Sequence, residues 1–307
     1  MLSRTADHLY WMSRYMERAE NITRFLEVAN RMALSAGKDR AAYWRPVLTI
    51  AGGEAAFAER YGERSAGAVI EFSVLDPANP SSIYSSLRSA RENAHAVRSV
   101  IPAETWESLN ATWIEARGID GPRLREQGLT SFCEWVRERS HQFRGITYGT
   151  MLRDEAYQFL RLGTFLERAD NTARLLGVRA AGVKSGNTEV DADDQLHWAA
   201  ILKSVSAFKA FRTVHGDNLT PMTAVDLLVM KDGMPRSLHA CLDQVNIILE
   251  KLNPKAECAR LAGAAHAQLH YGRLDQLMAR GLSRFITEFV ATNNAIGERI
   301  HQDFLLA

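Results

Sequence analysis

The stretch that decides the fold is Tyr15-Met-Glu-Arg-Ala-Glu-Asn-Ile-Thr-Arg-Phe-Leu-Glu-Val28, which returns as Phe165-Leu-Glu-Arg-Ala-Asp-Asn-Thr-Ala-Arg-Leu-Leu-Gly-Val178. Both copies space their apolar residues three and four positions apart, so each predicts an α-helix with one buried face. Their polar positions also agree, with Glu, Arg, Asn and Arg in the same order. A charged pattern that occurs on two helices indicates that the chain contains one structural unit twice.

A second pair of matching segments lies downstream of each copy. Residues 69–75 and 80–83 match residues 224–230 and 235–238, in the same order and with only a small change of spacing. Two matched blocks in one order argue for duplication of a unit about half the chain long.

The expected architecture is all-α, a helical bundle of about 10–12 helices in two similar halves related by a pseudo-two-fold axis. Residues 1–307 are expected to form one domain built from two repeats, residues 1–150 and residues 151–307. Proline and glycine are sparse, 8 and 20 residues, and stand between long periodic segments, as helix ends require. The clearest of these segments cover residues 3–31, 83–100, 104–116, 122–143, 152–181, 194–213, 236–252 and 272–304.

For one segment the sequence does not decide between a β-strand and a helix. Alternating strand patterns are nearly absent, and Val69-Ile-Glu-Phe-Ser-Val-Leu75 is the best candidate for a β-strand. A short buried helix fits the same residues equally well.

Charge and cysteine content exclude several classes of protein. The 37 Lys and Arg residues balance 36 Asp and Glu residues, which leaves no global field to attract nucleic acid or an anionic membrane. The three cysteines form no CxxC pair, so neither a disulfide framework nor a zinc knuckle is indicated. Arg4, Asp7 and His8 stand where a signal peptide would carry its apolar core. We therefore expect a cytoplasmic protein with neither nucleic acid nor membrane as a partner.

The repeated helices divide their charges between two faces. On a helical wheel, Arg14, Glu17, Asn21 and Arg24 share one narrow polar stripe. Arg18 falls instead within the apolar sector, as does its equivalent in the second copy. Because a buried unpaired charge costs several kcal/mol, this guanidinium needs a carboxylate from a neighbouring helix.

The motif charges have a structural interpretation. Glu17 with Arg168 and Glu167 with Arg18 would form reciprocal ion pairs that fix how the two halves pack. Two further pairs would be ordinary contacts between residues four positions apart on one helix, namely Glu20 with Arg24 and Asp170 with Arg174.

They also have a functional interpretation, in which both copies surround a central cleft. Arginines there would bind a carboxylate or phosphate group through paired hydrogen bonds, and Glu17 or Glu167 would act as general base if burial raised its pKa. The residues alone leave both interpretations open. The candidate ligand-binding or structural residues are Arg14, Glu17, Arg18, Asn21, Arg24, Glu167, Arg168, Asp170, Asn171 and Arg174.

At this motif the chain resembles the bacterial alpha-E family, which is all-helical. The resemblance spans essentially the whole chain. It is carried by residues 1–21, Asn79-Pro-Ser-Ser-Ile83, Leu87-Arg-Ser-Ala-Arg-Glu-Asn93, Asp154-Glu-Ala-Tyr-Gln-Phe159 and Leu166-Glu-Arg-Ala-Asp170. It implies a component of systems that pair an ATP-grasp ligase with transglutaminase-like or protease-like proteins and that form or cleave amide bonds in peptides.

By that resemblance we expect an accessory or partner protein that binds a peptide or carboxylate ligand in the Glu, Arg and Asn cleft. Two alternatives stay open, and with them the question of whether the chain is an enzyme. The chain could be a helical scaffold whose Glu-Arg repeats are structural, or an enzyme that acts on amide bonds through Glu17 and Glu167. Its oligomeric state is not predicted.

No cofactor and no metal are expected. The chain has no GxSxG, P-loop or GxGxxG motif, so ATP chemistry would come from a partner. His266 and His270 are four residues apart and can face one metal ion from a helix. Two histidines without a placed carboxylate are weak support for a metal site, so surface or core positions are the favoured interpretation.

Overall fold

The computed structural model describes residues 1–35, 41–62, 64–180 and 192–305, and all regular structure in these ranges is helical. The all-α prediction is therefore confirmed. The first eight α-helices are α1 (Ser3–Ser35), α2 (Arg45–Ala51), α3 (Glu54–Tyr61), α4 (Ala66–Val74), α5 (Ile83–Ala96), α6 (Ala103–Ala116), α7 (Gly121–Gln127) and α8 (Leu129–Thr150). The other eight are α9 (Glu155–Ala180), α10 (Ala192–Ser204), α11 (Phe208–His215), α12 (Pro221–Val225), α13 (Leu238–Leu252), α14 (Glu257–His270), α15 (Leu274–Arg280) and α16 (Leu282–Ile300).

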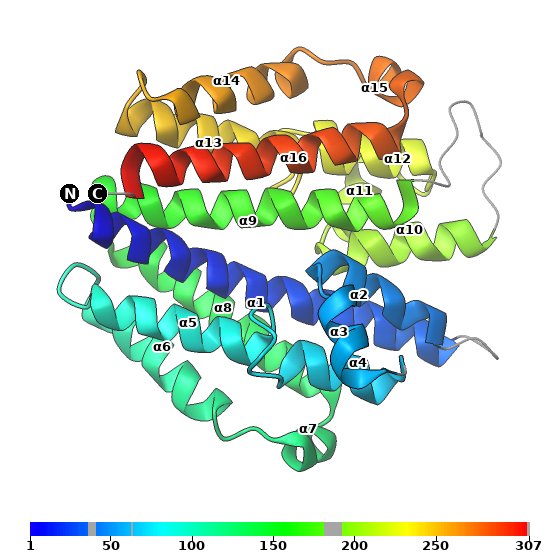
Figure 1. The fold of residues 1–307 in the computed structure, drawn as a ribbon. Coiled ribbons are helices and arrows are strands. Elements are labelled where there is room, and N and C mark those ends of the chain that lie inside the picture. Colours follow the sequence, from blue (N-terminus) through cyan, green and yellow to red (C-terminus); the bar gives the residue numbers. More distant parts are fainter. Residues whose placement is uncertain (36–40, 63, 181–191, 306–307) are drawn as a thin grey trace. The chain divides into compact units, whose positions relative to one another are not determined.

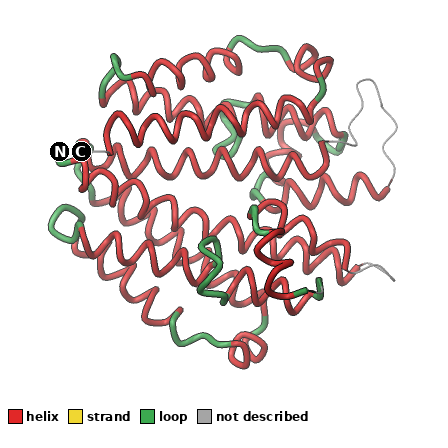
Figure 2. The backbone as a smooth tube through the Cα atoms, in the orientation of Figure 1, coloured by secondary structure: helices red, strands yellow, loops and turns green. Residues whose placement is uncertain are grey.

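The described residues also contain three short helical turns, η1 (Ala41–Trp44), η2 (Asp226–Met230) and η3 (His301–Leu305). Figure 2 shows helix throughout, joined by short loops. No helix among the described residues combines the length and the apolar character that a membrane crossing needs.

The chain forms two compact units, Met1–Thr164 and Phe165–Ala307, with α9 beginning in the first and ending in the second. In the first unit, the long helix α1 packs against α5 and α8, and α6 packs against the same two helices (Figure 1). Leu9, Met12 and Met16 of α1 are almost fully buried, as the apolar spacing of this helix requires.

In the second unit, α13 packs against α14, and α14 packs against α16 (Figure 1). Two buried hydrogen bonds attach α9 to these helices. Asn293 Nδ2 on α16 donates to the carbonyl oxygen of Leu166 at 3.2 Å, and Thr172 Oγ1 donates to that of Arg236 at 2.9 Å, just before α13.

Residues 69–74 of the candidate strand are helical and belong to α4, and Leu75 follows the end of this helix. Ser65 caps this helix by accepting a hydrogen bond from the backbone N–H of Ala68 at 3.2 Å. Val69, Phe72 and Ser73 are buried, which is the spacing of one helix face. Val69 and Phe72 of the candidate strand therefore fill the core from a helix.

The described residues form 16 α-helices, more than the 10–12 expected, in part because three predicted helices are each divided in two. The divided segments are residues 122–143, 194–213 and 272–304. Each break contains a residue with positive φ, namely Gly128 (84°), Ser206 (56°) and Gly281 (92°). A left-handed residue cannot continue a right-handed helix, so the helix ends there.

The remaining unpredicted helices are short or rich in alanine. Helices α2 and α3 have 7 and 8 residues, fewer than a helical period needs to stand out in a sequence. Helix α14 has 14 residues, but its many alanines give little contrast between an apolar and a polar face.

The elements of the two units follow one order along the chain. A long helix comes first (α1, α9), and three shorter helices follow it (α2–α4, α10–α12). A helix capped by a serine is next (α5, α13), then a helix of 14 residues (α6, α14) and one of 7 residues (α7, α15). The final long helix (α8, α16) begins after Gly128 or Gly281.

Candidate functional site

The first copy of the Glu-Arg motif lies on α1, a helix of 33 residues without glycine or proline. Helical spacing places Glu17, Glu20 and Arg24 along one side of α1, because residues three and four apart share a face. The glutamates are 2% and 0% exposed and the arginine is 7% exposed. Charged groups at this depth need partners, and helix α8 supplies several of them.

Both carboxylate oxygens of Glu20 accept hydrogen bonds. Arg24 donates to Oε1 through Nε at 3.0 Å and through Nη2 at 2.6 Å. Ser140 Oγ and Arg144 Nη1 donate to Oε2, the former at 2.7 Å. The side chain of His141 is 55% exposed and brings Nε2 to 3.8 Å from Oε1. Glu20 is therefore held by donors from two helices.

Arg144 also connects Glu17 and Glu20 of α1. Its Nη1 donates to Glu17 Oε2 at 3.2 Å and to Ser140 Oγ at 2.9 Å. Ser140 and Arg144 are four residues apart, so both face α1 from one side of α8. Two buried carboxylates thus share one guanidinium, whose side chain is 21% exposed.

A second ion pair extends the α1–α8 contact, because Arg137 donates to Glu27 Oε2. Burial lowers the pKa of Arg137, and the positive charge of Arg24 lowers it further. Charged contacts therefore run along α1 from Glu17 to Glu27. We call Glu17, Glu20, Arg24, Ser140 and Arg144 the α1–α8 network.

The two other arginines of the first copy lie on aromatic rings. Arg14 donates to the hydroxyl of Tyr10 at 3.0 Å, and its guanidinium carbon is 5.1 Å from the ring centre of Trp11. The guanidinium carbon of Arg18 is 5.5 Å from the ring centre of Tyr15. Both distances are typical of cation–π contacts. Arg18 thus meets an aromatic side chain in the apolar sector where the sequence placed it.

The second copy of the motif lies on α9. Glu167, Arg168 and Asn171 are buried, and the guanidinium carbon of Arg168 is 5.6 Å from the ring centre of Phe165. Arg174 Nε lies 2.6 Å from Asp170 Oδ2, and the side chain of Arg174 is 34% exposed, against 8% for Arg24. The polar end of the second copy is therefore the more accessible one.

The final helices of the two units differ at the positions that complete the network. Counted from Gly128 and Gly281, Ser140 of α8 corresponds to Asn293 of α16. By the same count Arg144 corresponds to a glycine, Gly297. The second unit therefore has no guanidinium at the position from which Arg144 binds Glu17 and Glu20.

The sequence predicted part of this arrangement. Glu20 with Arg24 and Asp170 with Arg174 form the expected pairs four residues apart, although the first pair is buried rather than an ordinary surface pair. Ser140 and Arg144 were missed, because neither recurs in the second unit and no motif marks them. The expected pairs of Glu17 with Arg168 and of Glu167 with Arg18 stay predictions.

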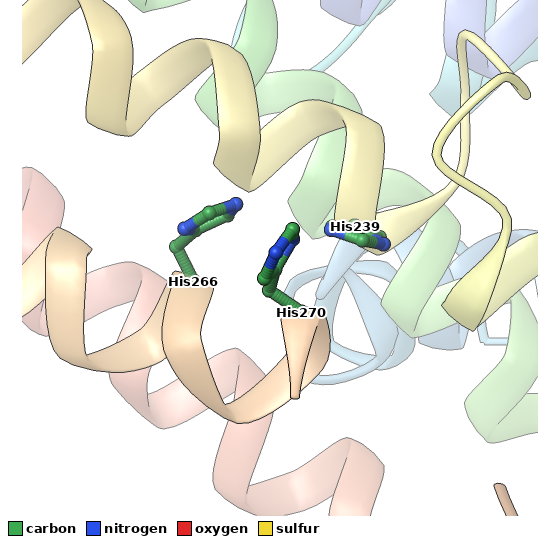
Figure 3. A group of neighbouring side chains, drawn as sticks. All are labelled: His239, His266 and His270. Atoms are coloured by element: carbon green, nitrogen blue, oxygen red, sulfur yellow. The ribbon is translucent and has the colours of Figure 1, made fainter. Parts of the chain in front are cut away.

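Two cavities lie away from the motif. One, of about 540 Å³, is lined by residues of α4, α7 and α8, and the other, of about 290 Å³, is lined by residues of η2 and α14–α16. No motif residue is among those that line them. Among the described residues, a group that could hold a metal ion consists of His239, His266 and His270 of the second unit (Figure 3).

Comparison with known proteins gives one match. A family model described as "a predicted alpha-helical domain with a conserved ER motif" matches residues 1–305. No curated protein and no solved structure matches the chain. The repeated stretch contains an adjacent Glu-Arg pair in each copy, Glu17-Arg18 and Glu167-Arg168.

Proposed function

The chain belongs to the Alpha-E family, and we propose that it is an accessory, non-catalytic component of a bacterial cytoplasmic system that forms amide bonds with an ATP-grasp ligase. The family resemblance implies that ligase as a partner, together with transglutaminase-like or protease-like proteins. Any ATP-dependent step then belongs to the ligase. The α1–α8 network supports the non-catalytic part of the proposal.

The observation that carries the non-catalytic role is the burial and hydrogen bonding of Glu20. A general base must reach the proton that it removes, directly or through one water molecule. Glu20 is fully buried, and Arg24, Ser140 and Arg144 already donate to its two oxygens. Glu17, 2% exposed, accepts from the same Arg144. A carboxylate held in this way stabilises the contact between two helices and is poorly suited to proton transfer.

We also propose that the two units arose by internal duplication. Their helices follow one order, and several lengths agree closely. Ser82 and Ser237 cap equivalent helices by accepting from the N–H three residues on, at 3.1 and 3.0 Å. Gly128 and Gly281 separate a 7-residue helix from the final long helix in each unit. This order of elements supports duplication beyond the repeated stretch of sequence.

A peptide or carboxylate ligand is proposed to meet the second copy of the motif. Arg174 exposes about a third of its side chain, whereas Arg24 is enclosed by the α1–α8 network. A partly exposed guanidinium can exchange its contact with Asp170 for a ligand carboxylate at low cost. Arg174, rather than the enclosed arginine, is therefore the residue to test for ligand binding.

The test uses the purified chain with an ATP-grasp ligase of the same organism. We expect the two proteins to co-purify, and we expect the chain to change the rate of ATP-dependent amide formation. Glu17→Gln should lower the melting temperature but keep that effect at a temperature where the variant is folded. Arg174→Ala should weaken the effect with little change of melting temperature. A ligase that neither binds the chain nor responds to it would refute the proposed role.

Two other functions predict different results. A pure scaffold would hold its partners together, so Arg174→Ala would leave amide formation unchanged. An enzyme that works through Glu17 and Glu167 would lose activity in a fully stable Glu17→Gln variant. The low exposure of Glu17 and Glu167, 2% and 6%, favours the accessory role over the enzyme.

A further inference from the structure

Three histidines lie close together in the second unit. His239 comes from α13, and His266 and His270 come from α14. One ring nitrogen from each lies within 4.8 Å of those of the other two. The three ring centres are 5.2–5.6 Å apart, and Figure 3 shows the rings gathered between the two helices.

Helix geometry explains this group. His266 and His270 are one helical turn apart, so their side chains share the face of α14 that packs against α13. His239 lies near the start of α13 and is 8% exposed. Two rings from one helix and one from its neighbour form a nearly equilateral triangle.

The tautomer of His239 suits a metal ligand. Its Nδ1 lies 2.9 Å from the carbonyl oxygen of Met230, which can only accept a hydrogen bond. Nδ1 therefore carries the proton, and Nε2 keeps the free electron pair. Histidines that bind metals commonly donate their second N–H to a backbone carbonyl in this way.

His266 has an unusual environment for a neutral side chain. Its Nε2 is shielded from solvent and makes no hydrogen bond within the described part of the chain. The nearest opposite charge is Asp243, whose Oδ1 is 3.5 Å away. A buried polar atom without a hydrogen bond needs an explanation, and a bound ion is one. The carboxylate would also offset part of the charge of a cation.

The first unit indicates that histidines are not needed to pack these helices. Its α5 and α6 hold the same places in the order of elements as α13 and α14. There Tyr84 and Trp113 meet with ring centres 5.0 Å apart. Two aromatic side chains are sufficient for this contact, so packing alone does not require three histidines there.

We propose that His239, His266 and His270 bind one divalent transition-metal ion of the zinc type. Imidazole is a good ligand for such ions, and three protein ligands leave the fourth position of a tetrahedral site to water or substrate. Ligand nitrogens at about 2.0–2.1 Å from zinc are roughly 3.4 Å apart, so the rings must close by at most about 1.4 Å. His270 is exposed and gives the ion access from solvent.

Titration of the full chain, without a polyhistidine tag, with zinc chloride against a competing chelator tests this site. We expect one zinc ion per chain. His266→Ala and His270→Ala should each weaken binding at least tenfold. His95→Ala removes an exposed histidine of the first unit and should leave the affinity unchanged. Zinc should raise the melting temperature of the parent chain and not that of His270→Ala, because only a ligand of the folded state stabilises it.

X-ray absorption gives a separate readout, with three nitrogen ligands expected at about 2.0–2.1 Å. Failure to bind one zinc ion per chain would overturn the proposal. So would binding that is unchanged in both His266→Ala and His270→Ala, or equally weakened in His95→Ala. The ligase plays no part in these measurements, so their outcome is independent of the proposed accessory role.

Discussion

Glu20→Gln is the most direct perturbation of the α1–α8 network. Glutamine keeps the size of the side chain but replaces one acceptor oxygen by an NH₂ group, which can only donate. Arg24 and Arg144 would then face a neutral amide, with Glu17 as the one carboxylate of the network left to Arg144. Removal of one partner from a buried ion pair typically costs about 3–5 kcal/mol. We expect a loss of that size, because Glu20 is fully buried.

The change in melting temperature follows from the size of the unit that unfolds. Unfolding entropy is about 2.1 cal/mol/K per residue, so the 164 residues of Met1–Thr164 contribute about 0.34 kcal/mol/K. A loss of about 3–5 kcal/mol then lowers the melting temperature of this unit by about 9–15 °C. If all 307 residues unfold together, the decrease is about 5–8 °C. Calorimetry distinguishes the two cases.

A matched control removes an exposed carboxylate instead. Glu288→Gln breaks an ion pair with Arg284 on α16, and the two side chains are 49% and 70% exposed. Exposed pairs contribute little, so the melting temperature should stay at the parent value. Replacement of Glu17, Glu20, Arg24 and Arg144 together by apolar residues of similar size should recover part of the loss, because no carboxylate of the network is then left without Arg144. A Glu20→Gln protein that melts like the parent would refute the structural role of the network.

Three further predictions concern a helix contact and two titrating groups. Gly163→Ala should lower the free energy of unfolding by about 1–3 kcal/mol, because its Cβ would lie 2.3 Å from the Tyr10 carbonyl oxygen and from Ser13 Oγ. Gly145→Ala, which meets nothing within 4 Å, should stabilise α8 by about 0.5–1 kcal/mol, and urea unfolding measures both. Burial and Asp303 raise the pKa of Cys258 to about 12, so at pH 8 its thiol should react with a disulfide reagent far more slowly than in the unfolded chain. Burial and Asp76 raise the pKa of Tyr61 from 10.0 to about 12. The protonated hydroxyl therefore stabilises the fold fully below pH 10, and this contribution is lost as the pH rises from 10 to 12. Urea unfolding should show this loss in the parent chain and not in Tyr61→Phe.

The sequence predicted those features that depend on local period and repetition. The spacing of apolar residues identified the long helices α1 and α9, and the motif identified the pairs Glu20–Arg24 and Asp170–Arg174. These features involve residues within one helix. Their geometry follows from 3.6 residues per turn, whatever the rest of the chain does.

Features that depend on tertiary contact could not be predicted in this way. Arg144 is 127 residues from Glu17, and no periodicity relates the two positions. His239 is 27 residues before His266 and meets it because α13 packs against α14. Glycine is a possible helix end, so the sequence did contain a signal for the breaks at Gly128 and Gly281, but a lone glycine is also tolerated inside a helix. A single sequence cannot tell which of the two applies.

The two copies of the motif therefore have different surroundings, and this difference indicates where function should be sought. In the first unit, Arg144 satisfies both motif glutamates, and the charges stabilise the contact between α1 and α8. In the second unit, the corresponding position of α16 is Gly297, and Arg174 retains contact with solvent. The histidine group has no counterpart in the first unit, where Tyr84 and Trp113 occupy that helix pair. Substitutions in the first unit should therefore alter stability, and those at Arg174 or the histidines should alter binding.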